Sequence, residues 1–286
     1  MAKELPVITP PKAVPIFEKI GIVGLGLIGG SIALKSRELW PTSLVIAVDN
    51  KDVLETAMRL HAIDVAADDL IVLAECDVVI LAAPVKQNEA ILRELDENVR
   101  TPAVVTDTGS TKREIVAAAK ALPPRFTFVG GHPLAGAARG GLEHARPDLF
   151  QGRPWLLTQH AEALESFIRA LGAEPKVVSV DAHDRLLAFL SHLPQFTASA
   201  LMDVVGEAVG EDGLSLAGRG LADTTRLASS PADIWRDIAA TNADEIGPAL
   251  DALIARLQEL RRDLPNGEHL TEVFDGAARW REHIKR

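Results

Sequence analysis

The feature that constrains the fold most is an alternation of short apolar runs with helical patterns between residues 19 and 180. Several of these runs are continuously apolar, which is typical of strands that are covered on both faces. Such an alternation predicts a doubly wound α/β fold with a parallel sheet. The predicted strands are 19–24, 43–49, 77–84, 102–109, 126–133, 154–158 and 175–180. A helix is predicted over 111–121, where Thr111 begins a capping-box spacing.

After Val180 the β-rich runs stop, and residues 180–210 and 229–264 have helical patterns. Asp181 and Ser230 are the predicted N-caps of these segments, and Pro194 predicts a kink. We therefore expect an irregular arm over 1–18, an α/β domain over 19–180 and a helical domain over 181–286. The helical part is apolar on broad faces, so we expect it to pack on the first domain and on a second protomer, giving a homodimer. A last helix is expected after Leu264.

The first predicted strand leads into a glycine loop, in which Gly24, Gly26 and Gly29 fit the pattern G-x-G-x-x-G. Gly24 would permit the tight turn, Gly26 would let the backbone approach a pyrophosphate, and Gly29 would let the helix pack on the strand. The pyrophosphate would lie at the helix N-terminus, where free N–H groups favour negative charge. The alternative is an ordinary glycine-rich turn.

The second predicted strand ends at Asp49, 20 positions after Gly29. A carboxylate there can accept hydrogen bonds from an adenosine ribose and repels a 2′-phosphate. Asn50 adds no compensating cation, although Lys51 is close. The sequence therefore predicts a Rossmann-type domain that binds NAD in preference to NADP.

Charge and composition exclude several other functions. The net charge of −10 and the lack of a Lys/Arg run argue against nucleic acid and anionic membranes as partners, and no apolar stretch approaches the ~20 residues of a membrane span. The single cysteine, Cys76, adjoins an apolar run and is predicted to be a buried hydrophobe, which suits a reducing cytoplasm. The chain has no tyrosine, which excludes a tyrosine base. We expect no metal ion.

Four side chains are candidates for chemistry beyond the cofactor. His132 ends a predicted strand in "VGGHPLAG", and a neutral imidazole there could accept a proton or be structural. Ser110, in "DTGSTK", could bind a ligand or cap the next helix. On pattern alone His192 fits a core histidine. Arg226 could bind a carboxylate or be an exposed loop residue.

Six motifs in this order, "GLGLIGGS", "LAAPV", "DTGSTK", "GHPLAG", "SHLPQ" and "DTTRLASSPADIWRDI", resemble the prephenate and arogenate dehydrogenases of tyrosine biosynthesis. The resemblance runs from about residue 20 to 264. It implies a Rossmann domain followed by a helical dimerisation domain. It also implies NAD(P)-dependent oxidative decarboxylation, in which prephenate gives 4-hydroxyphenylpyruvate or arogenate gives tyrosine.

The resemblance also implies a role for each motif. His132 would accept the proton of the ring hydroxyl, Ser110 would hold that hydroxyl, and Arg226 would bind a substrate carboxylate. His192 and Trp235 would line the substrate pocket. The residues implied at the cofactor, besides the three glycines and Asp49, are Leu27, Ile28, Ala82, Ala83, Pro84 and Thr108.

Two departures from the family pattern occur near the implied pocket. Ala138 stands where an acidic residue is common, and Arg219 interrupts a glycine turn, so the pocket would be more positive. Two other functions stay open from the sequence: a different Rossmann-plus-helical enzyme, such as a 3-hydroxyacid dehydrogenase, and a non-catalytic NAD-sensing protein.

Overall fold

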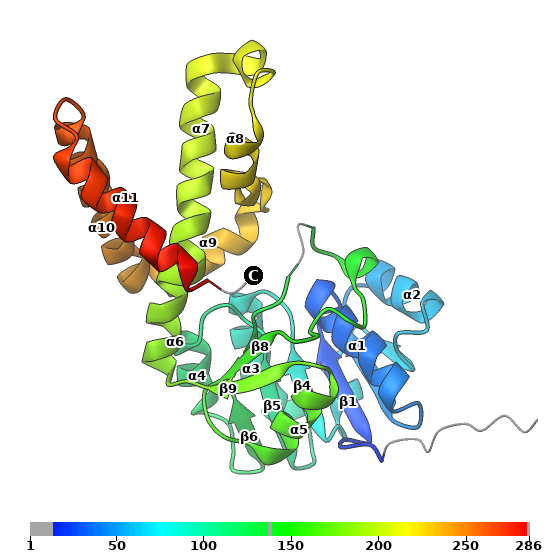
Figure 1. The fold of residues 1–286 in the computed structure, drawn as a ribbon. Helices are drawn as coiled ribbons and strands as arrows, with labels where there is room; N and C mark the ends of the chain where they lie inside the picture. Colours follow the sequence, from blue (N-terminus) through cyan, green and yellow to red (C-terminus); the bar gives the residue numbers. More distant parts are fainter. Residues whose placement is uncertain (1–13, 137–138, 285–286) are drawn as a thin grey trace, which may run out of the picture.

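The computed structural model describes residues 14–136 and 139–284, which form an α/β lobe followed by a helical lobe (Figure 1). The α/β lobe is built on six parallel strands in the order β3-β2-β1-β4-β5-β6. The order reverses between β1 and β4, and ligands collect at such a switch point in open α/β sheets. The strands are β1 (Lys19–Val23), β2 (Leu44–Val48), β3 (Val65–Ala67), β4 (Val78–Leu81), β5 (Ala103–Asp107) and β6 (Phe126–Val129).

Both faces of this sheet are covered, which confirms the predicted doubly wound class. Along β4, Val78 and Ile80 enter one apolar cluster, whereas Val79 and Leu81 enter another on the opposite face. This explains why the strand is continuously apolar in the sequence. The helices of this lobe are α1 (Leu27–Leu39), α2 (Lys51–Arg59), η1 (Leu70–Leu73), α3 (Val85–Asn98), α4 (Arg113–Ala119), η2 (Leu142–His144) and α5 (Glu162–Ala170).

A second sheet corrects the predicted single strand 126–133. The chain leaves β6 after Val129 and starts β7 (Gly131–Pro133), which pairs with β8 (Pro154–Leu157), itself paired with β9 (Glu174–Val177). A Cβ on Gly131 would lie 2.5 Å from the backbone oxygen of Asp107, so only glycine permits this close approach. The short strand β3 was also missed.

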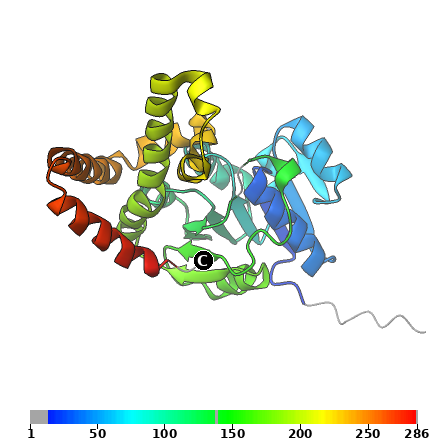
Figure 2. The same cartoon turned by 45° about the horizontal axis from the view of Figure 1, so that its top comes forward.

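The first helix of the helical lobe, α6, follows β9, and Figure 2 shows the helices of this lobe projecting from the α/β lobe. Pro194, where a kink was predicted, lies in the first turn of α7, which directly follows a π-helical turn, η3. The kink that the structure shows lies farther along α7, at Gly210, which has φ +63° and ψ −174°. A last helix after Leu264 is confirmed. The elements are α6 (Val180–Leu187), η3 (Ala188–His192), α7 (Leu193–Leu214), α8 (Arg219–Thr224), η4 (Arg226–Ser229), α9 (Ala232–Thr241), α10 (Ala243–Asp263) and α11 (Glu268–Glu282).

The capping box predicted at Thr111 is wrong. The Thr111 hydroxyl contacts the Thr241 hydroxyl at 2.8 Å, and no side chain of α4 caps its own helix. Instead, the carboxylate of Asp184, from α6, accepts hydrogen bonds from the backbone N–H groups of Lys112 and Arg113 at 2.8 and 2.9 Å. The start of α4 is therefore capped from the other lobe, which local sequence cannot indicate.

The two N-caps predicted in the helical lobe are also wrong. Ser179, not Asp181, caps α6 by accepting from the N–H of Ala182. Ser230 does not cap α9, because its hydroxyl donates to the Gln195 side chain at 3.2 Å. For α6 the cap is a neighbouring serine, and for α9 the predicted cap is used in a tertiary hydrogen bond instead.

The remaining expectations concern the arm and the cysteine. Most of the arm over 1–18 lies outside the described residues, and 14–18 contain no helix or strand. Cys76 is fully buried, as predicted, and burial raises the pKa of its thiol to about 12. No helix in the described part of the chain is long and apolar enough to cross a membrane.

Candidate active site

The glycine loop after β1 has the geometry that a dinucleotide requires. Gly24 has φ +93°, and a Cβ on it would lie 2.7 Å from the backbone of Ala82. A Cβ on Gly29 would lie 1.9 Å from the Gly24 carbonyl oxygen, so helix and strand touch there. A Cβ on Gly26 would meet nothing within 4 Å, because Gly26 faces open space. That space is available for a phosphate group to approach the backbone.

Two adjoining cavities open at the carboxyl ends of the central strands. The first cavity, of 590 Å³, is lined by Gly24, Gly26, Asp49 and Asn50. The second cavity, of 420 Å³, shares Gly26 with the first and reaches α9 of the helical lobe. Residues 82–84 line both. The predicted residues that line only the second cavity are Leu27, Ile28, Thr108, Ser110 and Trp235.

The residues of the first cavity fit the adenosine end of a dinucleotide. The Asp49 carboxylate lies at the end of β2, held by the N–H of Leu25 at 2.6 Å and the side chain of Asn50 at 2.8 Å. Helix α1 follows Gly26 with no acidic residue in its first turn, so its free N–H groups face the cavity unopposed. A ribose hydroxyl could hydrogen-bond to this carboxylate, and a pyrophosphate could bind these N–H groups.

His132 lies in β7, three residues before the cavity-lining Ala135, and is 9% exposed. Its Nδ1 is 2.9 Å from Nε2 of His183 in α6. Burial lowers the pKa of His132 well below its usual value, and the nearby His183, Lys112 and His192 lower it further. The ring is therefore neutral at neutral pH, as a proton acceptor must be.

A buried ion pair holds the Ser110 loop next to the His132 strand. The carboxylate of Asp107 pairs with the ammonium of Lys112, and both side chains are 1% exposed. The same carboxylate accepts from the N–H of Gly109 at 2.8 Å and from that of Gly131 at 3.0 Å. Asp107 thus fixes the residues that directly precede Ser110 and His132.

His192 is fully buried at the end of the π turn, and its ring lies edge-on to Trp235 at 6.0 Å. Its Nδ1 is 3.2 Å from the side-chain nitrogen of Asn242, which also donates to the backbone oxygen of Asp184. Asn242 is thereby fixed as a donor, so Nδ1 of His192 accepts and Nε2 carries the hydrogen. That Nε2 is buried without a partner among the described residues. Burial lowers the pKa of His192 to about 4.

Arg226 is not brought to either cavity. It is exposed at the start of η4, four residues before Ser230, which does line the second cavity. Arg219 is likewise exposed, at the start of α8. Ala138, the other departure from the family pattern, lies outside the described residues.

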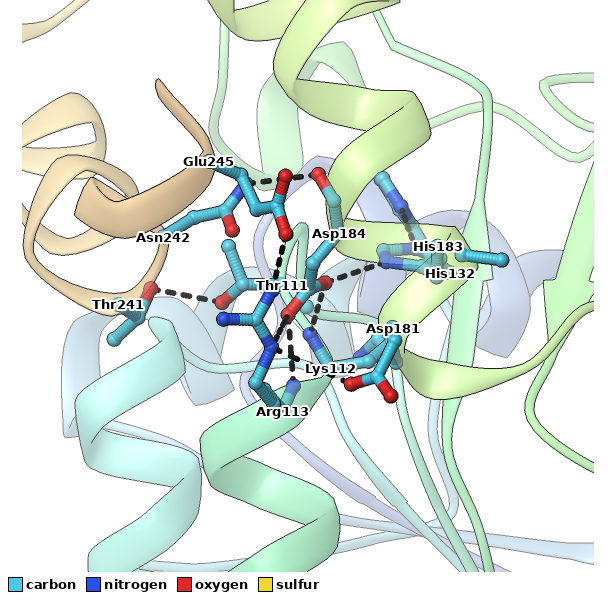
Figure 3. Close-up of polar contacts among 12 residues, drawn as sticks. Thr111, Lys112, Arg113, His132, Asp181, His183, Asp184, Thr241, Asn242 and Glu245 are labelled. Atoms are coloured by element: carbon cyan, nitrogen blue, oxygen red, sulfur yellow. Dashed lines mark hydrogen bonds and ion pairs between the residues drawn. The ribbon is translucent and has the colours of Figure 1, made fainter. Parts of the chain in front are cut away.

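Sequence patterns did not identify the polar residues of the helical lobe that are hydrogen-bonded to His132 directly or through His183. Figure 3 shows Asp184 between His183 and the start of α4, with Asn242 and Arg113 alongside. The one available signal was the adjacent His-Asp pair in "VDAHD", at the start of a predicted helix. Nothing local indicated that this pair faces a histidine 51 residues away.

Family models for two domains match this chain in order. Residues 32–175 match the nucleotide-binding domain of prephenate dehydrogenase, and residues 179–275 match its dimerization domain. A prephenate dehydrogenase of Bacillus subtilis is 34% identical over 282 residues, which cover 93% of this chain and 76% of that protein. A cyclohexadienyl dehydrogenase of Zymomonas mobilis is 30% identical over 284 residues, which cover 94% and 97% of the two chains.

A solved structure shares the whole fold. It is a prephenate dehydrogenase from A. aeolicus in complex with hydroxyphenyl propionate and NAD+, with a TM-score of 0.87 and 27% sequence identity. The match covers 96% of this chain and 100% of that one. With both domain models matched and a fold shared from end to end, the chain belongs to the prephenate dehydrogenase family.

Proposed function

We propose that the protein catalyses the NAD-dependent oxidative decarboxylation of prephenate to 4-hydroxyphenylpyruvate, or of arogenate to tyrosine. The observation that carries this proposal is a buried, neutral histidine, His132, in the strand that leads to a cavity shared with a dinucleotide loop. The family match and the NAD+ in the A. aeolicus relative support it. A non-catalytic NAD sensor would not need a neutral base there.

In this reaction a hydride leaves the ring carbon that bears the hydroxyl, the ring carboxylate departs as carbon dioxide, and the ring becomes aromatic. NAD, when bound, supplies the hydride acceptor. His132 accepts the hydroxyl proton, while Ser110, in the loop that follows β5, hydrogen-bonds to the same oxygen. Trp235 lines the second cavity and would contact the substrate ring. The main task of these residues is orientation, because aromatisation drives the chemistry.

His192 and Arg226 are proposed to bind the rest of the substrate. The unpartnered Nε2–H of His192 supports a hydrogen bond to a substrate oxygen, because a buried donor without a partner is costly. Arg226 has the planar fork that suits a carboxylate, and its neighbour Ser230 already lines the second cavity. A dianion needs such a local cation, because the net charge of the chain is −10.

We further propose that the protein is a homodimer of chains divided near Val180, with residues 19–180 binding the cofactor and 181–286 forming the interface. The second family model is described as a dimerization domain. Large apolar side chains are exposed on the helical lobe, among them Val204, Phe274 and Trp280, which are 64, 64 and 75% exposed. A cytoplasmic location is proposed from the single, buried and unpaired cysteine.

The deciding experiment is steady-state kinetics with prephenate and arogenate, each with NAD and with NADP. We expect reduced cofactor to form with at least one substrate and NAD to be preferred, because Asp49 repels a 2′-phosphate. Absence of turnover with all four combinations by folded, NAD-binding protein would overturn the proposed activity. A preference for NADP would overturn only the role of Asp49.

The pH dependence follows from the state of His132. A base works in its neutral form, and a lowered pKa keeps that form present to lower pH. The acid limb of kcat/KM is therefore expected well below pH 6.5, the ordinary value for histidine, with a plateau above it. Initial rates across the pH range in which circular dichroism shows folded protein measure this. An acid limb at or above 6.5 would contradict the role of burial and of the Lys112 ammonium near the ring.

Two alanine substitutions in the glycine loop should distinguish an effect on NADH binding from an effect on the stability of the fold. Gly26→Ala places a methyl group in the open space and is expected to raise the Kd for NADH by about tenfold or more, with little change in stability. Gly29→Ala forces a Cβ to within 1.9 Å of the Gly24 oxygen, and the free energy of unfolding should fall by about 1–3 kcal/mol. Fluorescence titration and thermal unfolding measure the two. If the two variants change the Kd for NADH and the free energy of unfolding to the same extent, the separate roles of Gly26 and Gly29 are contradicted.

A further inference from the structure

A buried chain of three side chains runs from His132 to the contact between the lobes. Nδ1 of His132 lies 2.9 Å from Nε2 of His183, and Nδ1 of His183 lies 2.7 Å from Oδ1 of Asp184 (Figure 3). The relative exposures of the three residues are 9, 1 and 0%. None of the roles proposed above uses His183 or Asp184.

Asp184 is held as an anion. Its two carboxylate oxygens accept from the N–H groups of Lys112 and Arg113 at the start of α4, where partial positive charge gathers. The Arg113 guanidinium lies 3.9 Å away. Burial opposes ionisation, but the hydrogen bonds from His183 and from the two backbone amides outweigh it, and the pKa of Asp184 is lowered.

An ionised Asp184 fixes where each hydrogen of the chain lies. A carboxylate only accepts, so Nδ1 of His183 carries a hydrogen, and in a neutral ring Nε2 is then an acceptor. That acceptor takes its hydrogen bond from Nδ1–H of His132. The remaining nitrogen of His132, Nε2, is left with its lone pair free for a substrate hydroxyl.

The opposite arrangement requires His183 to be an imidazolium that donates on both sides. His132 would then carry its hydrogen on Nε2 and could not act as a base. This arrangement adds a buried cation close to Lys112, while the charge of Asp184 is already met by Arg113 and the α4 amides. An additional buried charge without a carboxylate of its own is costly, so the neutral chain is favoured.

We propose that His183 and Asp184 are positioning residues that hold His132 in the tautomer with a free lone pair on Nε2. This proposal rests on the function proposed above. In the reaction the hydroxyl proton moves to Nε2 of His132, and the hydride moves from the ring carbon to the nicotinamide. Nδ1–H stays on His132 and continues to donate to His183, so that the new imidazolium faces Asp184 through one neutral ring.

The kinetic test uses three variants and a matched control. Asp184→Asn removes the negative charge that faces His183 and leaves one α4 N–H opposite an amide N–H, and kcat is expected to fall ~10²-fold. KM for the substrate and Kd for NADH should stay within about threefold, since neither residue lines a cavity. His183→Leu should have a similar effect. His183→Gln should recover at least about tenfold over His183→Leu, because its Oε1 can accept from Nδ1–H of His132.

The control is Asp181→Asn, which removes an acid from the same helix. The Asp181 side chain is 91% exposed, and its one polar partner within the described residues is Arg113, at 3.7 Å, so Asp181→Asn should leave kcat unchanged. Asp184→Asn could fail to fold because Asp184 caps α4. In that case the comparison of His183→Leu with His183→Gln tests the proposal. Equal kcat in wild type, His183→Leu and His183→Gln would overturn the proposal.

A second readout needs no turnover. In protein with 15N-labelled histidine, the His132 ring, assigned by comparison with His132→Asn, should show a bare Nε2 and a protonated Nδ1. In His183→Leu, whose side chain accepts no hydrogen bond, the fraction of this tautomer should fall. A protonated Nε2 in the wild type would overturn the positioning role even if the enzyme is active. An inactive wild type with a bare Nε2 would instead count against the proposed function.

Discussion

Replacing His132 by asparagine is expected to lower kcat by ~10²–10⁴-fold, the usual contribution of a positioned general base. Asparagine can still hydrogen-bond to His183, but it cannot take up a proton. The Kd for NADH should be unchanged, because the residues that line the first cavity do not include His132. Stopped-flow or steady-state rates with the preferred substrate, together with a fluorescence titration, measure both quantities.

His160 provides the control for this substitution. It is a histidine of the same lobe, its side chain is 83% exposed, and its ring hydrogen-bonds to Glu165 alone among the residues that the structure describes. His160→Asn should therefore retain the wild-type rate. A His132→Asn variant that keeps its fold and the wild-type rate would show that the proton goes to a different group.

The second large effect is expected from Asp107→Asn, on stability. The substitution leaves the Lys112 ammonium, 1% exposed, without its carboxylate, and removing one partner of a buried ion pair costs about 3–5 kcal/mol in the free energy of unfolding. Lys112→Met should cost less, because Asp107 keeps the N–H groups of Gly109 and Gly131 as donors. Urea denaturation of the protein without cofactor measures this order.

Breaking an exposed ion pair is the comparison. Lys19 and Glu75 pair at the surface, with side chains 35 and 71% exposed, and Glu75→Gln should leave the free energy of unfolding nearly unchanged. If Asp107→Asn is no more destabilising than Glu75→Gln, the buried pair is not a support of the site. Its proposed part in fixing the Ser110 loop and β7 would then fail as well.

The contact between the two lobes adjoins the proposed base. Arg113, at the start of α4, pairs with Asp244 and Glu245 of α10. Directly beside these pairs, Asp184 caps α4 and contacts His183. The same acidic side chain thus joins the lobes and, in the proposal above, fixes the tautomer of His132.

Local patterns predicted the elements that depend on neighbouring residues. The apolar runs indicated the parallel sheet and the alternation of its strands with helices, which the structure confirms. This succeeds because a strand buried on both faces needs continuous apolar residues. The glycine loop indicated a dinucleotide site at Gly26 and Asp49, and for these residues the role stays a prediction. The motif resemblance indicated His132 and Ser110, which the structure places on adjoining segments tied by Asp107.

Features that depend on distant partners were wrong or missed. Thr111 was assigned as a cap because its spacing fitted one, whereas the actual cap comes from Asp184, about 70 residues later. The single strand predicted over 126–133 is split between two sheets, because Gly131 meets the backbone of Asp107 across the fold. A local window contains neither partner.

The sequence by itself determined the fold class, the cofactor loop and the identity of the histidine proposed as the base, since each is written in residues a few positions apart. Only the tertiary structure decided the environment of that histidine. Burial, the His183–Asp184 pair and the Asp107–Lys112 pair come from segments that meet only when the helical lobe packs on the sheet. The pKa of an imidazole and the position of its hydrogen depend on these contacts, because charge and hydrogen bonding act through space and not along the chain.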